Sequence, residues 1–120
     1  MTTNEEYLHK QAVMDTLDII GGKWKFPLIY CLCNGRKRFS EIEKTLSTIT
    51  PTALSNTIKD LETHHIIKKT TDSSSKLVYY ELTAYSQELK PIFLQLQTFG
   101  LKHRTNIISN LFNIPIIHKT

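Results

Sequence analysis

The stretch TPTALSNTIKDLETHHI, from Thr50 to Ile66, decides how the rest of the chain is interpreted. Its first residues predict the start of a helix, because the Thr50 hydroxyl can accept a backbone N–H and Pro51 has no N–H to leave unpaired. Leu54, Ile58 and Leu61 then recur at helical spacing and form one apolar side. The stretch therefore predicts an amphipathic helix that ends near the two histidines.

The opposite side of this helix carries short polar or basic residues. They are Thr52, Ser55, Asn56 and Lys59. None of them resists close approach to a polyanion, and a helix with an apolar back and such a front fits the major groove of DNA. Taken alone, the same side chains would also suit an ordinary solvated helix, so the flanking sequence has to decide.

Two helices are predicted upstream. The first covers residues 9–20, with an apolar stripe that includes Val13 and Leu17, and the glycines at 21 and 22 end it. The second runs from about residue 23 to 33, with Trp24, Leu28 and further aliphatic residues directed inward. Asn34 and Gly35 end it, as glycine often does after a helix.

A short helix is predicted directly before the Thr50 stretch. Phe39, Ser40 and Glu43 form the pattern of a hydrophobic residue followed by a capping box, with Ser40 as the N-cap. This helix ends near residue 47, and a short turn joins it to the helix that Thr50 opens. Two helices joined in this way, the second with a polar face, predict a helix-turn-helix.

The periodicity then changes from 3.6 to 2. Residues 66–71 and 77–82 are rich in β-branched and aromatic residues, and DSSSK between them predicts a turn. We expect a β-hairpin in which Val78, Tyr80 and Leu82 face the core. A hairpin at this place is a wing.

The last helix is predicted from about residue 84 to at least residue 108, with Thr83 as its cap. Leu89, Phe93 and Leu96 lie on its main stripe, whereas Leu94 lies off it. A helix that is apolar on more than one side is hard to cover within 120 residues, so the pattern favours a homodimer.

Composition agrees with this picture. The chain has 120 residues, the size of one domain, and a formal net charge of +4 with a pI near 9.1, which is compatible with a nucleic-acid partner. Cys31 and Cys33 are too close in sequence to staple a fold, so a reducing compartment is expected. No signal peptide and no apolar run of the ~20 residues that a membrane span needs is apparent, so we expect a cytoplasmic protein without a membrane partner.

Four stretches resemble one known family. LDIIGGKW (17–24), NGRKRFSEIEKTL (34–46), ITPTALSNTIKDLE (49–62) and VYYELT (78–83) resemble the HxlR-type winged helix-turn-helix transcriptional regulators, over roughly residues 11–104. The resemblance implies a bacterial or archaeal homodimer that binds operator DNA, with the first and last helices at the interface.

The predicted fold class is therefore α+β, mainly helical: a winged helix-turn-helix with a two-stranded wing hairpin and N- and C-terminal dimerisation helices. We expect one domain over 1–120, with dimerisation helices at about 9–20 and 84–114, the helix-turn-helix at 40–64 and the wing at 66–82. The predicted function is sequence-specific binding of double-stranded DNA at a palindromic operator. A winged helix used as a protein-interaction module, without direct DNA binding, is the alternative.

The chain departs from the family pattern at two places. Many members have a sensing cysteine near the start of the first helix, whereas the aligned residue here is Gln11. That sensing mechanism therefore does not carry over. Family wings often hold a proline pair before the second strand, whereas Ser74 and Ser75 stand here, so a more mobile wing tip is expected.

Ten residues are candidate DNA contacts, four of them on the Thr50 helix. Asn56 is the best base reader because an amide can bond adenine at two places, and Lys59 is expected at a phosphate. The full set is Thr52, Ser55, Asn56, Lys59, Arg36, Arg38, Ser40, Lys68, Lys69 and Lys76. For Arg38 an ion pair with a carboxylate such as Glu41 is the alternative, and the wing lysines could simply be a solvated, aggregation-resistant edge.

No enzyme, cofactor or metal site is expected. The five histidines show no ligand spacing, and no nucleotide-binding or nucleophile motif is present. Cys31 and Cys33 lie two apart on a helix and point about 200° from each other, so they favour buried filling over an internal disulfide. A redox role for Cys31 or Cys33, and a small-molecule effector of unidentified class, stay open.

Overall fold

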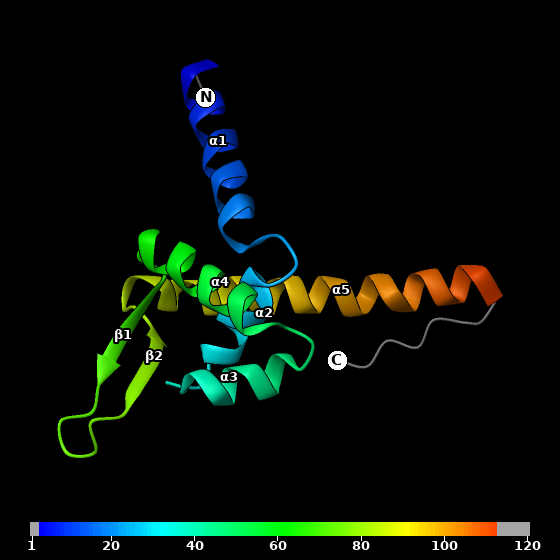
Figure 1. Ribbon diagram of the computed structural model, residues 1–120. Helices are drawn as coiled ribbons and strands as arrows, with labels where there is room; N and C mark the ends of the chain where they lie inside the picture. The colour runs from blue at the N-terminus through cyan, green and yellow to red at the C-terminus, as the bar shows by residue number, and fades with distance from the viewer. Residues whose placement is uncertain (1–2, 113–120) are drawn as a thin grey trace. The chain divides into compact units, whose positions relative to one another are not determined.

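The computed structural model describes residues 3–112. Four helices come first: α1 (Thr3–Ile20), α2 (Lys25–Leu32), α3 (Phe39–Leu46) and α4 (Pro51–Thr63). Strands β1 (Ile67–Thr71) and β2 (Val78–Leu82), a short 3-10 helix η1 (Tyr85–Glu88) and helix α5 (Leu89–Phe112) follow (Figure 1). This order confirms the mainly helical winged helix-turn-helix. The chain divides into two compact units between Gln87 and Glu88.

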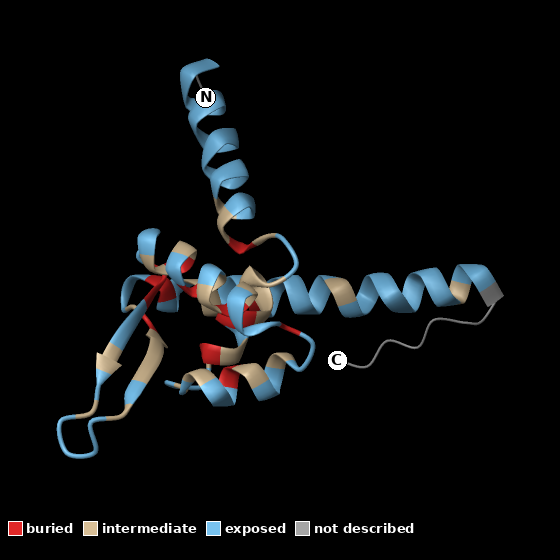
Figure 2. Cartoon of the chain, viewed as in Figure 1, coloured by how far each residue is buried: buried red, intermediate tan, exposed pale blue. Residues whose placement is uncertain are grey.

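The buried residues of the first unit gather on its central helices and at the base of the hairpin (Figure 2). Helix α2 contacts α3 and β2, and α4 contacts β1. The most deeply buried aliphatic side chains are Leu28, Ile29, Leu32, Ile42, Leu54 and Leu61. The predicted apolar sides of α2 and α4 are thus confirmed. Trp24 is an exception, because its side chain stays only half-buried at the N-terminus of α2.

The predicted start of α3 was wrong by two residues. Arg38, not Ser40, is the N-cap, and Glu41 Oε1 accepts the Arg38 backbone N–H at 2.9 Å. The cause lies outside the local sequence. Lys37 pairs with Tyr80 of β2, N–H to carbonyl in both directions at 2.9 and 2.8 Å. This bridge keeps the backbone extended up to Arg38, so the helix begins at Phe39.

The wing hairpin is antiparallel and pairs Ile67 with Leu82 at its base and Thr71 with Val78 near its tip. In Figure 1 it extends away from the helices of its own unit. Leu82 is buried, Tyr80 is half-buried and Val78 is 37% exposed. The prediction that all three face the core therefore holds only for Leu82, because the outer part of the hairpin extends away from the helices of its unit (Figure 1).

A group of hydrogen bonds joins the base of the wing to the segment that follows α4. The Thr83 N–H donates to Ile66 O at 3.0 Å and the Thr83 hydroxyl donates to His65 O at 2.8 Å. The buried Ser86 hydroxyl donates to Ile66 O as well. Thr83 also accepts the Ser86 N–H at 3.2 Å, so it caps η1, and α5 begins only at Leu89.

The turn between α1 and α2 requires its glycines. A Cβ at Gly21 would lie 2.5 Å from the Leu17 carbonyl oxygen, and Gly22 has φ of +89°. Directly after this turn Lys25 makes two contacts. Its Nζ donates to the Asp18 carbonyl at 3.3 Å and lies 2.9 Å from Asp60 Oδ2. One ammonium group therefore connects the end of α1 with α4.

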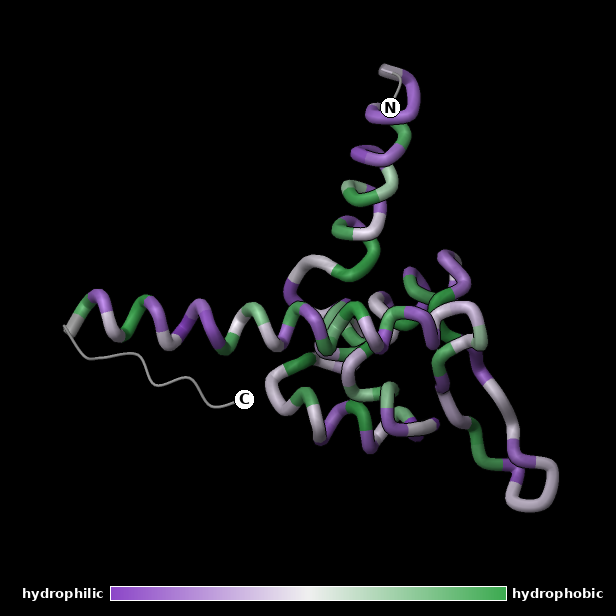
Figure 3. The backbone as a smooth tube through the Cα atoms, turned by 180° about the vertical axis from the view of Figure 1, so that it is seen from behind, coloured by the Kyte–Doolittle hydropathy of each residue, from purple (hydrophilic) through white to green (hydrophobic). Residues whose placement is uncertain are grey.

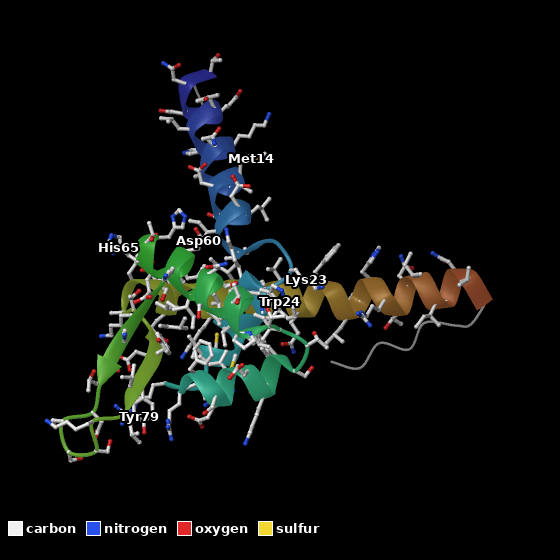
Figure 4. All side chains as sticks on the ribbon, viewed as in Figure 1. Met14, Lys23, Trp24, Asp60, His65 and Tyr79 are labelled. Atoms are coloured by element: carbon white, nitrogen blue, oxygen red, sulfur yellow. The ribbon has the colours of Figure 1, made fainter. Side chains whose placement is uncertain are left out.

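Asp60 is the acceptor at the α4 end of this connection and is labelled in Figure 4. The hydrogen bond from Lys25 is the main cause that lowers the pKa of Asp60 below its ordinary value of 3.8. His64 Nε2 lies 3.8 Å from the other carboxylate oxygen, one turn further along α4. The C-terminal end of α4 is thus held electrostatically as well as by its apolar side.

The second unit contains α5, whose predicted end at residue 114 lies outside the described residues. Apolar and polar residues alternate along α5 and along α1 (Figure 3). Many of the large apolar side chains stay exposed. They include Tyr7, Leu8, Val13, Met14 and Leu17 on α1 and Leu94, Leu96, Phe99, Leu101 and Leu111 on α5. Among residues 3–112, no helix combines the length and apolarity that crossing a bilayer requires.

Replacing Ile42 with alanine should lower the free energy of unfolding by about 2–5 kcal/mol, because it opens a cavity among fully buried side chains. Chemical denaturation measures this change. Lys44→Ala, on the exposed side of the same helix, is the control and should change stability by no more than about 0.5 kcal/mol. Equal effects of the two substitutions would contradict this account of the core.

Asp60→Asn should destabilise the protein in a pH-dependent way. The folded-state pKa of Asp60 is lowered, so its contribution is present above the unfolded-state pKa and is lost as pH falls through the folded-state value. The difference in unfolding free energy between wild type and variant should therefore be constant near neutral pH and shrink as the pH falls below the ordinary pKa of 3.8. Glu62→Gln, on the same helix and without an ion-pair partner among residues 3–112, should show no such trend. A difference independent of pH would refute the linkage.

Candidate nucleic-acid interface

The exposed side of α4 presents unpartnered polar groups. Thr52, Asn56 and Lys59 are exposed and Ser55 is half-buried. Within residues 3–112 these four side chains make no hydrogen bond or ion pair. The Thr50 hydroxyl accepts the Ala53 N–H at 3.1 Å, as predicted for the cap. The helix is therefore fixed through its start and its apolar side, which leaves the polar side available to a ligand.

The turn from α3 to α4 spans only residues 47–50. Ser47 has φ of +49° and its N–H donates to Glu43 O at 2.9 Å, which ends α3. Ile49 is buried in the middle of the turn. A buried anchor in so short a turn fixes the direction in which α4 leaves α3.

The N-terminus of α3 places two of the predicted contact residues on the surface. Arg38 and Ser40 are exposed, and their side chains make no hydrogen bond or ion pair within residues 3–112. The Glu41 carboxylate accepts the backbone N–H of Arg38. The alternative, an ion pair between the Arg38 and Glu41 side chains, is therefore replaced by a contact to the Arg38 backbone. The Arg38 guanidinium remains available for a phosphate.

The wing lysines differ from one another. Lys68 lies 3.3 Å from Glu81 across the hairpin, whereas Lys69 and Lys76 are exposed without an ion pair in the described part of the chain. Two of the three predicted charges are therefore free, and the third is partly neutralised. Nothing in the sequence pattern alone identified Glu81 as the partner of Lys68, although the two prove to be directly opposite in register.

Arg36 is held within the protein. Its guanidinium carbon lies 4.0 Å from the centre of the Tyr79 ring, and Nη2 lies 3.6 Å from Asp72 Oδ1. Tyr79 is labelled on the hairpin in Figure 4. The alternation that directs Tyr80 to the core leaves Tyr79 on the outer side of the strand, and the sequence predicts only a turn at Asp72. An aspartate at the start of a serine-rich turn often accepts hydrogen bonds from the residues that follow it, and this signal could have identified Asp72 as the acceptor in the turn.

The two cysteines are reduced thiols of intermediate exposure, Cys31 within α2 and Cys33 directly after it. They form no disulfide with each other. Among the described residues 3–112, no three His, Cys, Asp or Glu side chains are grouped in a way that could hold a metal ion.

Two open hollows, each of about 370 Å³, lie near the end of α1. One is lined in part by Leu17, Trp24 and Thr57, and the other by Asp15, Lys25 and His64. In the first, Lys23 Nζ lies 5.3 Å from the Trp24 ring centre (Figure 4). Charged and apolar groups are mixed in both hollows, so neither defines a class of ligand.

Comparison with known proteins agrees with this geometry. Residues 19–107 match the model of the HxlR-like helix-turn-helix family. The HTH-type transcriptional regulator YdeP of Bacillus subtilis is 38% identical over 79% of this chain and 75% of its own length. The regulator YtcD of the same organism is 30% identical over 92% of this chain and 88% of its own length.

Solved structures are similar as well. The redox regulator HypR in its reduced form has 35% sequence identity and a TM-score of 0.73, covering 82% of this chain and 98% of that one. The reduced form of the regulator YodB from B. subtilis has 26% identity and a TM-score of 0.67, covering 83% and 91%. The chain belongs to the HxlR-like helix-turn-helix family, and it is a DNA-binding transcriptional regulator of the winged helix type.

Proposed function

We propose that the protein acts as a homodimer that recognises a palindromic operator, with one α4 helix of each subunit in the major groove and the wing on flanking DNA. The observation that carries this proposal is the polar side of α4. Thr52, Asn56 and Lys59 are exposed, and they have no partner within the described part of the chain, on a helix whose apolar side is buried. A two-fold dimer would place two such helices on half-sites about one or two DNA turns apart.

The contacts divide into base readers and backbone contacts. Asn56 is suited to adenine, and Thr52 and Ser55 to bases or phosphates, while Lys59 meets a phosphate. Arg38 and Ser40 face the backbone from the start of α3. Lys69 and Lys76, with Lys68 once it leaves Glu81, follow the flanking backbone from the wing. Neutralised phosphates release counterions, so binding should weaken steeply with salt.

The homodimer is supported by the exposed apolar side chains of α1 and α5. Phe99 is 68% exposed and Leu111 is 73% exposed, values that water does not favour for large apolar groups. A second copy of the chain that covers α1 and α5 would remove these surfaces from water. We expect such a dimer to act in the cytoplasm, together with the DNA that it binds.

A signal for this regulator is a separate matter. HypR is a redox regulator and YodB has been solved in a quinone-bound form. This chain has Gln11 at the position of the family's sensing cysteine, and Cys31 and Cys33 lie elsewhere, on α2 and directly after it. An effector, if one acts here, would thus have to use different groups.

Asn56→Ala combined with Lys59→Ala should weaken operator binding about 10- to 100-fold, because each side chain supplies a direct DNA contact worth about 1–3 kcal/mol or one phosphate charge. Mobility shift at two salt concentrations measures the loss and should show a shallower salt dependence. The matched control is Lys44→Ala with Asn34→Ala, the same residue types at exposed positions outside the proposed contacts and outside α1 and α5. If wild type binds an operator and both double variants bind it equally well, α4 is not the reading helix. If a folded wild-type dimer binds no promoter fragment, a protein-interaction role replaces DNA binding.

Met14→Glu should convert the dimer into a folded monomer, because it places a charge within the apolar residues of α1. Light scattering coupled to size exclusion measures the mass, and operator binding should fall with it. Ala12→Glu adds the same charge two residues away, about 200° around the helix, and should leave the dimer intact. A Met14→Glu protein that remains dimeric would exclude α1 from the interface.

A further inference from the structure

Arg36 contacts two parts of the wing, its stem and its tip. It precedes Lys37, whose backbone pairs with Tyr80, and so it enters alongside β2. Its guanidinium covers the Tyr79 ring at 4.0 Å and lies 3.6 Å from the Asp72 carboxylate. Tyr79 belongs to the stem of the hairpin, whereas Asp72 opens its tip. One side chain at the start of the helix-turn-helix therefore contacts both.

Asp72 in turn organises the tip. Its Oδ2 accepts the Ser74 hydroxyl at 2.7 Å, the Ser75 hydroxyl at 2.8 Å and the Ser75 N–H at 2.9 Å. Its backbone N–H donates to Leu77 O at 2.8 Å, and its carbonyl accepts the Lys76 N–H at 2.9 Å. These bonds hold the tip in one shape without prolines. The tip therefore has more internal hydrogen bonds than expected from the replacement of the family's proline pair by Ser74 and Ser75.

The charge state of Asp72 favours the same arrangement. The Ser75 N–H, followed by the Ser74 and Ser75 hydroxyls, holds the pKa of Asp72 well below the usual range of a carboxyl group. Asp72 is thus a permanent negative charge on a surface that should lie near phosphates. Such a charge opposes DNA binding by simple electrostatics, so its benefit must come from geometry.

We propose that Arg36, Tyr79 and Asp72 form a positioning cluster that fixes the wing tip relative to α3 and so places Lys76 and Lys69 against the DNA backbone. This inference rests on the proposed function, and it assigns Arg36 an indirect role in place of a direct phosphate contact. A guanidinium suits the role because its plane can stack on a ring while its edge faces a carboxylate.

The Asp72→Ala variant distinguishes a positioning role of Asp72 from an effect of its negative charge. A purely electrostatic role predicts tighter binding, because a negative charge is removed near DNA. The positioning role predicts binding weaker by about tenfold, with hydroxyl-radical protection lost at the flanks of the operator and kept at the centre of each half-site. The control is Glu81→Gln, which removes a carboxylate from the same hairpin and frees Lys68, and should bind as tightly as wild type or more tightly.

A second pair of variants avoids any change of charge. Ser75→Ala removes a hydroxyl that donates to Asp72 and accepts the Leu77 N–H at 3.3 Å. Ser73→Ala alters a neighbouring residue of the tip whose hydroxyl makes no such bond. Ser75→Ala should lose flanking protection and Ser73→Ala should keep it. Arg36→Lys, which keeps the charge but not the planar stack, should behave as Ser75→Ala does.

The outcomes distinguish this inference from the function on which it rests. If wild type protects an operator and Asp72→Ala protects the same flanks with equal or higher affinity, the positioning cluster is refuted and the DNA-binding role stands. If Arg36→Lys binds as wild type does, Arg36 acts through its charge alone and the cluster is again refuted. If wild type protects no operator, the proposed function itself fails.

Discussion

Two backbone hydrogen bonds between Lys37 and Tyr80 are the constraint on which the winged half of the molecule depends. They join a segment before α3 to the second strand of the hairpin, so the wing is attached to the helix-turn-helix at its side as well as through the chain. The same bonds keep Arg38 extended and start α3 at Phe39. They also bring Arg36 to Tyr79. The bridge adds a side attachment to a two-stranded ribbon, which on its own is marginally stable in water.

Local patterns predicted the elements that local forces determine. Leu54, Ile58 and Leu61 are buried as their spacing indicated, and Thr50 caps α4 as its hydroxyl allows. The predicted cap at Ser40 was wrong because two capping patterns overlap there, and a long-range strand pairing selects between them. The predicted burial of Val78 was wrong for a related reason. Alternation predicts which residues share a side of a strand, but it does not predict how much of the strand the helices cover.

The candidate site shows the same division. The polar side of α4 follows from helical periodicity, and the structure leaves it exposed. The contacts of Arg36 could not be predicted, because Asp72 and Tyr79 are remote from it in sequence and meet it only after the hairpin has folded. Lys68 and Glu81 are likewise opposite one another only in the final register. Residue type indicates what a side chain can bind, whereas the fold decides which partner reaches it first.

The apolar residues left exposed on α1 and α5 have a consequence for how much regulator a cell can maintain. In the proposed homodimer a second copy covers them and binds only folded chains, so association and folding would be linked by mass action. The folded fraction would then rise with the total concentration of the chain and fall when the protein is diluted. Dilution would expose the same side chains to proteases and chaperones. The number of molecules able to occupy DNA would thus decline faster than the rate of synthesis, which makes the response to a change in expression steeper than linear.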